Sequence, residues 1–168
     1  MKLAEAKMEF VQNWGAIGSS WGIPKSMGQI HALLLATNEA MSTEEIMETI
    51  QLSRGNVNIN LRELINWKLI QKQNIIGQRK EFFKAKHDIW EMATNIVEER
   101  KRRELYPALS LLESLSKESI EGEADEVKHF KVMVKDLHEF IVQMDKLSGL
   151  MVKLKKNIFF QRMLKMAT

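Results

Sequence analysis

Residues 52–85 constrain the fold more than any other stretch, because a helical pattern is followed directly by a hairpin pattern. Ser53 is a favourable N-cap, since its hydroxyl can accept a hydrogen bond from a free amide of the first helical turn. The apolar residues after it recur three and four positions apart, which predicts one buried stripe on a helix of about three to four turns. That stripe consists of Val57, Leu61, Leu64 and Ile65.

The opposite face of this predicted helix is rich in asparagine and arginine. A solvated helix face normally carries Glu, Lys and Gln, because asparagine is a mediocre helix former. Asparagine can instead bond adenine bidentately, and arginine can bond guanine or a phosphate. The composition therefore favours contact with nucleic acid over the alternative, an ordinary amphipathic helix with an exposed polar face. The residues expected on this face are Arg54, Asn56, Asn58, Asn60 and Arg62.

A β-hairpin is predicted immediately after the helix. Residues 69–76 and 80–85 are two short runs of strand-forming residues around Gly77-Gln78-Arg79, and glycine at a tight connection is a hairpin signal. A helix followed by a basic-tipped hairpin is typical of a wing: the helix enters the major groove of DNA, and the hairpin reaches the flanking backbone or minor groove. The alternative role for Arg79 and Lys80 is protection of an edge strand by charge.

Positive charge is concentrated in this part of the chain. Residues 54–86 contain eight Lys and Arg side chains against two Glu, a net charge of +6, whereas the whole chain is only +3. The remainder is therefore net negative, and the basic stretch is the expected footprint for a polyanion. The phosphate contacts predicted on this ground are Lys72, Arg79, Lys80 and Lys84.

The segments before Ser53 complete a predicted helix-turn-helix. Helices are expected at residues 2–14 and 25–36. Pro24 precedes the second of these helices, which is compatible with it because proline is tolerated in a first turn. Ser42 and Glu45 match a capping box that opens a short acidic helix over residues 43–50. A tight turn at Gln51-Leu52 then leads into the asparagine-rich helix. Two helices joined by a short turn, with a basic outer face on the second, are the arrangement that reads DNA in such motifs.

Residues 88–168 are predicted to form a helical dimerisation region. Asp88 can cap a helix from Ile89, Pro107 can kink or restart it, and residues 116–125 predict a turn. Residues 126–165 are expected to form one helix of about 60 Å. Its apolar seam is coiled-coil-like and too long to be buried on so small a domain, so a second copy of the chain is the expected partner. The seam comprises Val127, Phe130, Val134, Leu137, Ile141, Met144, Leu147, Met151, Leu154 and Ile158.

The predicted domains are therefore a DNA-binding domain at residues 1–87 and the dimerisation region at residues 88–168, with residues 1–20 also packing on the dimerisation helices. Among the 168 residues there is no apolar run of about 18, so no membrane span is expected. The N-terminus lacks the apolar core of a signal peptide, and there is no cysteine for disulfides or thiolate metal sites. A cytoplasmic protein is the expectation.

The sequence offers little for catalysis, cofactors or metals. It contains no glycine-rich phosphate loop, no nucleophile elbow and no carboxylate pair placed for acid–base work, so a non-enzyme without cofactors is predicted. Asp125 and His129 lie four residues apart with His138 further along, which is short of the three or four converging ligands that a metal needs.

A small-molecule effector pocket is a further hypothesis. Tryptophan favours cationic ligands, and the candidate lining residues are Trp14, Trp21, His31 and Trp90, with Phe130 as another aromatic. The alternative is that these aromatic side chains are plain core and that His31 is a core or interface histidine.

Three stretches resemble the winged-helix regulators of the multiple-antibiotic-resistance (MarR) type, in the branch named for the glycine-betaine synthesis repressor, GbsR. They are WGIPKSMGQIHALLLAT at residues 21–37, LSRGNVNINLRELINWKLI at residues 52–70 and GQRKEFFKAKHDIW at residues 77–90. The resemblance implies a homodimeric DNA-binding repressor or activator that a small ligand often relieves. It places Ser53, Arg54, Asn56 and Asn58 on the base-reading end of the helix, and Arg62 and Arg79 on backbone and wing contacts. Lys68 departs from the family pattern, which usually has glycine before the wing.

The combined prediction is a mainly α fold with a small β-hairpin wing: a winged helix-turn-helix domain followed by long C-terminal dimerisation helices. The predicted function is sequence-specific binding of double-stranded DNA as a homodimeric transcriptional regulator, with repression favoured and no membrane partner. Two alternatives stay open. One is a winged-helix protein–protein interaction module, and the other is a nucleoid-type DNA binder without sequence preference.

Overall fold

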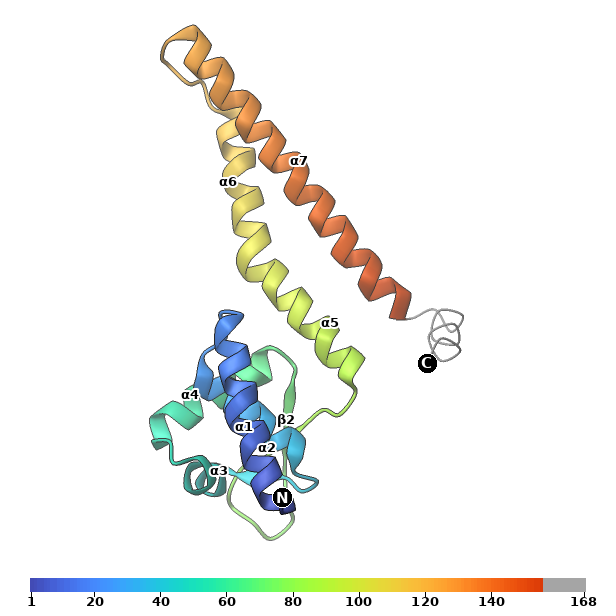
Figure 1. Cartoon of the computed structure of the whole chain (residues 1–168). Helices are drawn as coiled ribbons and strands as arrows, with labels where there is room; N and C mark the ends of the chain where they lie inside the picture. Colours follow the sequence, from blue (N-terminus) through green and yellow to red (C-terminus); the bar gives the residue numbers. More distant parts are fainter. Residues whose placement is uncertain (156–168) are drawn as a thin grey trace. The chain divides into compact units, whose positions relative to one another are not determined.

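The computed structural model describes the backbone of residues 1–155 and the side chains of residues 1–150. The chain divides into two compact units, Met1–Asn95 and a second unit that begins at Ile96 (Figure 1). The division falls within α5 (Ile89–Arg100), whose predicted cap is confirmed: the Asp88 carboxylate accepts a hydrogen bond from the Glu91 amide at 2.8 Å. The first unit is mainly helical with a small antiparallel sheet, and it holds every residue expected to contact DNA.

The first two helices cross at a pair of glycines. The prediction that the first helix ends at residue 14 is wrong, because α1 spans Leu3–Ser20 and runs through Gly15 and Gly18. It packs on α2 (Lys25–Ala36), whose predicted bounds are confirmed. A Cβ on Gly28 would lie only 3.1 Å from the Cα of Gly15, so the two backbones would have to move apart by a few tenths of an ångström to admit a side chain there. A glycine that resembles a helix break in sequence is here a helix–helix contact.

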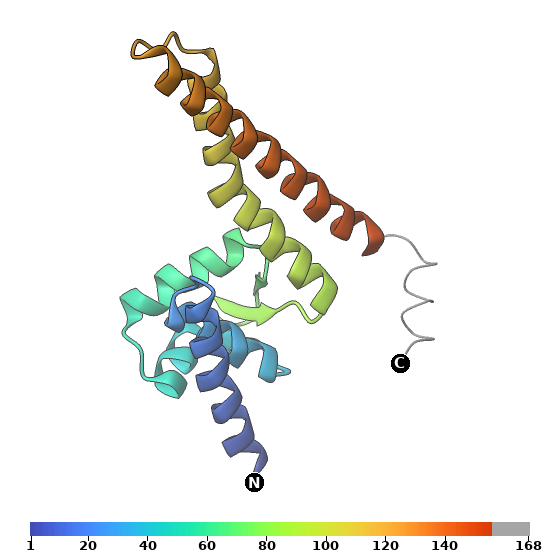
Figure 2. The same cartoon turned by 45° about the horizontal axis from the view of Figure 1, so that its top comes forward.

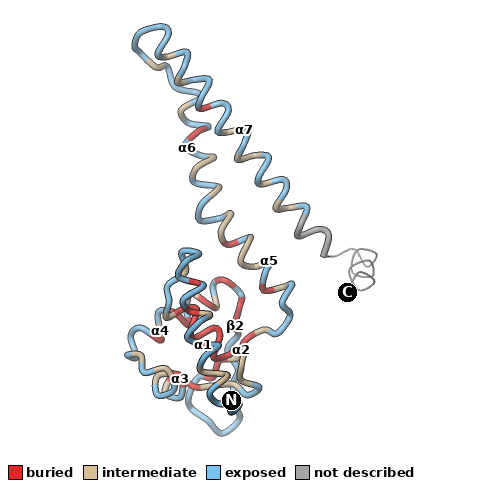
Figure 3. The backbone as a smooth tube through the Cα atoms, in the orientation of Figure 1, coloured by how far each residue is buried: buried red, intermediate tan, exposed pale blue. Residues whose placement is uncertain are grey.

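The hydrophobic core of the first unit is built around α2. Every residue from Met27 to Leu34 is buried, so this helix is enclosed on all sides, as Figure 3 shows in red. Around it pack α3 (Thr43–Ile50) and α4 (Arg54–Asn66), which the sequence predicts. The largest fully enclosed side chains come from all four helices: Val11, Ile30, Leu34, Ile46, Val57, Leu61 and Leu64.

The sheet has three strands rather than the two predicted. Its order is β1-β3-β2, with β1 (Met41–Ser42), β2 (Ile70–Gln73) and β3 (Phe82–Ala85) all antiparallel. The prediction of strand structure through residue 76 is wrong, because β2 ends at Gln73 and residues 74–81 form a long connection. Within that connection the Gln78 amide bonds the Ile75 carbonyl at 3.0 Å, and Gly77 takes the positive φ of 85° that such a turn favours.

The second unit is a helical hairpin. The chain passes from α5 through a π-helical turn, η1 (Lys101–Leu105), into α6 (Tyr106–Lys117), so Pro107 lies in a first turn. After a turn, α7 (Ala124–Lys155) returns beside α6 in the opposite direction (Figures 1 and 2). The Lys101 ammonium lies 2.8 Å from the Asp145 carboxylate, which ties η1 to α7 and raises the pKa of Lys101.

The predicted seam of α7 divides into two stripes. Val134 is buried and Ile141 half-buried within the hairpin, whereas Leu137, Met144 and Leu147 are exposed. The described part of α7 ends at Lys155, so the predicted continuation to residue 165 lies outside the described residues, as do the side chains of Met151, Leu154 and Ile158. No helix in the described part of the chain is long and apolar enough to cross a membrane.

Candidate nucleic-acid interface

Serine caps begin both α3 and α4, as the sequence predicts. The Ser42 hydroxyl accepts a hydrogen bond from the Glu45 amide at 3.3 Å, and the Glu45 carboxylate accepts one from the Ser42 amide at 2.7 Å. The hydrogen bonds that the Ser42 amide and then the Ser42 hydroxyl donate to the Glu45 carboxylate hold the pKa of Glu45 below its usual range. Gln51 ends α3 in the left-handed region with φ 54°, and Ser53 then accepts from the Asn56 amide at 3.4 Å. The caps fix the direction in which α4 leaves the turn.

The outer face of α4 differs from the prediction at two positions. Arg54, Asn56 and Arg62 are exposed as expected, but Asn60 is only 6% exposed. Asn60 follows Val57 by three residues and therefore lies on the buried stripe, so helical spacing alone could have placed it there. Ile59 is 64% exposed instead, an apolar side chain on the polar face that the sequence reading did not single out. Asn58 is half-buried.

The buried Asn60 side chain joins α4 to α2. Its Nδ2 atom donates to the Ser26 hydroxyl at 3.1 Å, to the Asn56 carbonyl at 2.9 Å and to the Asn56 side-chain oxygen at 2.6 Å. Burial of an amide is costly unless it is hydrogen-bonded, and these acceptors meet that need. One arm of this network ends on Asn56, a residue predicted to touch bases.

Glu44 on α3 forms ion pairs with two of the residues predicted to contact DNA. Its carboxylate lies 2.8 Å from the Arg54 guanidinium at the start of α4 and 3.8 Å from the Lys80 ammonium in the hairpin connection. The hydrogen bond from Arg54 is the largest cause that lowers the pKa of Glu44, and the charge of Lys80 adds to it. The first turn of α4 and the hairpin connection therefore lie on one surface, although Arg54 follows Glu44 by 10 positions and Lys80 follows it by 36.

The hairpin does not present all of its lysines together. Lys72 lies opposite Phe83, whereas Lys84 lies opposite Gln71. Directly opposed residues share a face and successive residues alternate, so Lys72 and Lys84 lie on opposite faces of the ribbon. Lys72 also pairs with Glu81 at 2.6 Å.

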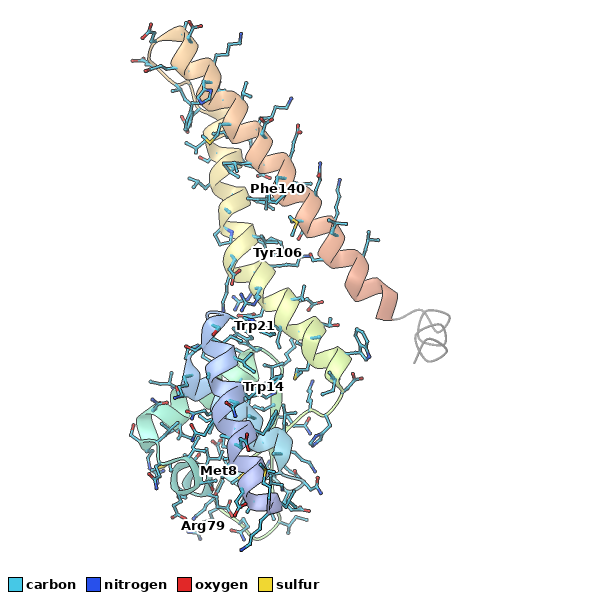
Figure 4. All side chains as sticks on the ribbon, viewed as in Figure 1. Met8, Trp14, Trp21, Arg79, Tyr106 and Phe140 are labelled. Carbon is cyan, nitrogen blue, oxygen red and sulfur yellow. The ribbon has the colours of Figure 1, made fainter. Side chains whose placement is uncertain are left out.

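Arg62 and Arg79 differ from these lysines. Both are exposed, and neither forms an ion pair with another of the described residues. Arg79 lies in the hairpin connection (Figure 4).

The departure at Lys68 has a clear structural consequence. Lys68 has φ 58°, in the left-handed region that favours glycine. The Lys68 amide bonds the Ile65 carbonyl at 2.8 Å and the Leu69 amide bonds the Leu64 carbonyl at 3.0 Å, which is the Schellman ending of a helix. The Lys68 carbonyl accepts from the Asn95 side chain at 3.1 Å. A lysine thus occupies the one position of this ending that glycine fits best.

The predicted effector residues lie in different surroundings. His31 is 4% exposed, its Nε2 atom has no hydrogen-bond partner, and burial lowers its pKa to about 4. Trp14 is half-buried with its ring 5.5 Å from that of Phe10, whereas Trp21 and Trp90 are 63% and 58% exposed. Figure 4 shows Trp14 and Trp21 on α1 and at its end. The shared pocket stays a prediction. Among residues 1–150, no group of three or more His, Asp or Glu side chains is placed to hold a metal ion.

Comparison with known proteins adds two similarities, while no protein-family model matches the chain. The chain is 29% identical over 80 residues to the HTH-type transcriptional regulator MmpR5 of Mycobacterium tuberculosis (strain ATCC 25618 / H37Rv). That match covers 47% of this chain and 48% of MmpR5, about half the length of each. A solved structure named "Crystal Structure of a transcriptional regulator" has a TM-score of 0.68 at 17% identity, covering 90% of this chain and 99% of that one. The chain therefore shares the fold of that protein.

Proposed function

We propose that this chain is a transcriptional regulator that binds double-stranded DNA in a sequence-specific manner as a homodimer. The observation that carries the proposal is the single basic surface formed by the start of α4 and the hairpin connection, where Arg54 and Lys80 meet at one carboxylate. Similarity to MmpR5, a protein named as an HTH-type transcriptional regulator, supports the same role. A MarR-type winged helix-turn-helix of the GbsR branch is the finer form of this proposal.

In this proposal α3, the turn and α4 form the helix-turn-helix, and α4 enters the major groove with its N-terminal residues on base edges. The hairpin β2–β3 is the wing. Arg62, Arg79 and Lys80 contact the backbone, and only one of Lys72 and Lys84 joins them, because the two lie on opposite faces of the ribbon. The base-reading residues are Ser53, Arg54, Asn56 and Asn58.

The exposed stripe of α7 supports dimerisation. Apolar residues recur on it three and four positions apart, as in a helix that packs on another helix, and a stripe of this length is costly to leave in water. A symmetric dimer would set two α4 helices about 34 Å apart on a pseudo-palindromic site. Regulation by repression, with relief by a small ligand, completes the proposal. The stripe contains Met133, Leu137, Phe140, Met144 and Leu147, each at least 38% exposed.

The test is fluorescence anisotropy of the full chain on the DNA upstream of its own gene against a scrambled duplex, from about 50 to about 200 mM salt. We expect a clear preference for the upstream DNA and an affinity that falls steeply with salt, because cations on phosphates release counterions. Arg62→Ala should weaken binding to both duplexes, whereas Lys117→Ala, an exposed lysine on α6, should change neither. Equal binding of both duplexes would favour a nucleoid-type protein.

A protein–protein interaction module is the second candidate, because two apolar side chains are exposed near the same surface. Ile59 is 64% exposed on α4, and Ile76 is fully exposed in the hairpin connection. Exposed apolar groups are frequent at protein interfaces, although Ile59 can equally contact a thymine methyl group. Absence of binding to any duplex at low salt, with the protein folded and dimeric, would favour this second function.

A further inference from the structure

We infer that Asn56 presents the NH2 group of its side chain to DNA and reads a keto base, guanine first and thymine second, rather than adenine. The inference rests on the proposed DNA-binding function and assigns the base class that this position of α4 selects. It depends on the contact between Asn60 Nδ2 and Asn56 Oδ1 at 2.6 Å.

The chemistry of the neighbouring atoms fixes the orientation of Asn60. One end of its side chain lies 2.9 Å from the main-chain carbonyl oxygen of Asn56, and a carbonyl can only accept hydrogen bonds. The end that faces it must therefore be the NH2 group, because the amide oxygen would repel the carbonyl. The Ser26 hydroxyl at 3.1 Å accepts from the same NH2 group. Asn60 is 6% exposed, so water competes poorly for these acceptors.

The orientation of Asn60 then fixes that of Asn56. The Asn56 atom that lies 2.6 Å from the Asn60 NH2 group has to be an acceptor, which is Oδ1. The two ends of a planar amide diverge, so the Asn56 NH2 group points away from this contact. Asn56 is exposed, and it lies in the first turn of α4, where base contacts of such helices occur.

An outward NH2 group discriminates between bases. Bidentate recognition of adenine needs the amide oxygen and the amide NH2 on the same base edge, because adenine offers one donor and one acceptor in the major groove. Here the oxygen faces Asn60 and accepts from it with one of its two lone pairs, so the oxygen and the NH2 group do not present one common edge to a base. Guanine offers two adjacent acceptors, N7 and O6, and thymine offers O4, whereas cytosine offers only a donor. We expect guanine to be preferred over adenine by roughly tenfold at the position that Asn56 reads.

The experiment selects binding sites from a random duplex library with the full-length protein and with Asn56→Ala. The base pair whose preference disappears in Asn56→Ala is the position that Asn56 reads. We expect guanine or thymine there. If guanine is selected, replacing it with 7-deazaguanine, which lacks the N7 acceptor, should weaken binding by the wild-type protein and leave Asn56→Ala unaffected.

Two further variants test the role of the buried network. Asn60→Ala releases Oδ1 of Asn56 and should bring the guanine-to-adenine ratio close to one. The matched control is Ser26→Ala, which removes a different acceptor of Asn60 and keeps the Asn56 contact, so its ratio should stay at the wild-type value. Asn56→Asp is close in shape, keeps an oxygen toward Asn60 and places a second oxygen outward. It should shift the preference to cytosine, whose N4 amino group donates. This variant decides the matter if Asn60→Ala does not fold.

Several outcomes would overturn the inference. The inference is wrong if the wild-type protein selects adenine or cytosine at this position. It is also wrong if the guanine-to-adenine ratio is unchanged in both Asn60→Ala and Asn56→Asp, because Asn60 then does not determine which base Asn56 contacts. If no base preference depends on Asn56 while other positions of the site stay specific, the inference fails and the proposed function stands. If the library yields no bound duplex, both fail.

Discussion

Lowering the pH from about 8 to about 5 should destabilise the first unit by about 2 kcal/mol through His31 alone. Burial lowers the pKa of His31 to about 4 in the folded protein, against 6.5 for an unperturbed histidine. The unfolded chain therefore binds a proton that the folded chain does not. The stability that this provides is fully present above pH 6.5 and is lost as the pH falls toward 4. At about 1.4 kcal/mol for each pKa unit the complete loss is about 3 kcal/mol, of which about 2 falls above pH 5.

The assay is urea unfolding followed by tryptophan fluorescence at several pH values between about 8 and about 5. The chain has four tryptophans, Trp14, Trp21, Trp67 and Trp90, and all lie in the first unit, so the signal reports that unit alone. The lower limit of about pH 5 matters because Glu44, Glu45 and Glu99 also have altered pKa values. Their pKa values are lowered, so their stabilising effect is lost only below the usual carboxylate range.

His31→Leu is the decisive variant, because leucine fills a similar volume and does not titrate. It should remove most of the pH dependence between pH 8 and 5. His87→Leu is the control, since His87 is an exposed histidine of the same unit and should leave the wild-type slope intact. An unchanged slope in His31→Leu would refute the reasoning, because the proton taken up on unfolding would then belong to another group.

Three further predictions concern α4, the charged surface and α7. Lys68→Gly should stabilise the first unit by about 0.5–1 kcal/mol in urea unfolding, because glycine accepts the φ of 58° without strain, whereas Asn66→Gly, at the last helical residue of α4, should destabilise it. A loss of stability in Lys68→Gly would contradict the assigned Schellman ending. Glu44→Gln should tighten DNA binding in anisotropy, because it frees Arg54 and Lys80 for phosphates. Glu48→Gln changes charge equally on the exposed side of α3 and should have less effect, so equal gains would mean that only net charge matters. Leu137→Glu should convert a dimer into a monomer by light scattering, while Lys128→Glu on the same helix should not; a dimer that survives Leu137→Glu would exclude this stripe.

Local sequence signals predicted the helices of the first unit well, because caps and periodicity act over a few residues. Ser42, Ser53 and Asp88 all cap as expected. The errors come from contacts between distant residues. β1 has only two residues and exists because Met41 pairs with Phe83, for which no local pattern exists. The continuation of α1 past residue 14 depends likewise on the contact of Gly15 with Gly28.

In the candidate site, too, the polar contacts between distant residues could not be predicted from the sequence. The residue types on α4 and the hairpin could be read from the sequence, but their partners could not. Asn60 was expected on the outer face because asparagine is polar, although its spacing from Val57 places it inside. The ion pairs of Glu44 with Arg54 and Lys80 cross from one element to another, and no spacing rule predicts them.

These partners change the electrostatic argument as well as the geometry. The net charge of +6 for residues 54–86 omits Glu44 and Glu91, which lie outside that window but pair with Arg54, Lys80 and Lys86. Exposed ion pairs are weak, so a phosphate can displace these carboxylates. Breaking each ion pair nevertheless costs part of the free energy that the new phosphate contact provides. Arg62 and Arg79 have no such partner among the described residues and break no ion pair on binding. The affinity of the proposed interface should therefore depend more on these two arginines than the sequence charge alone implies.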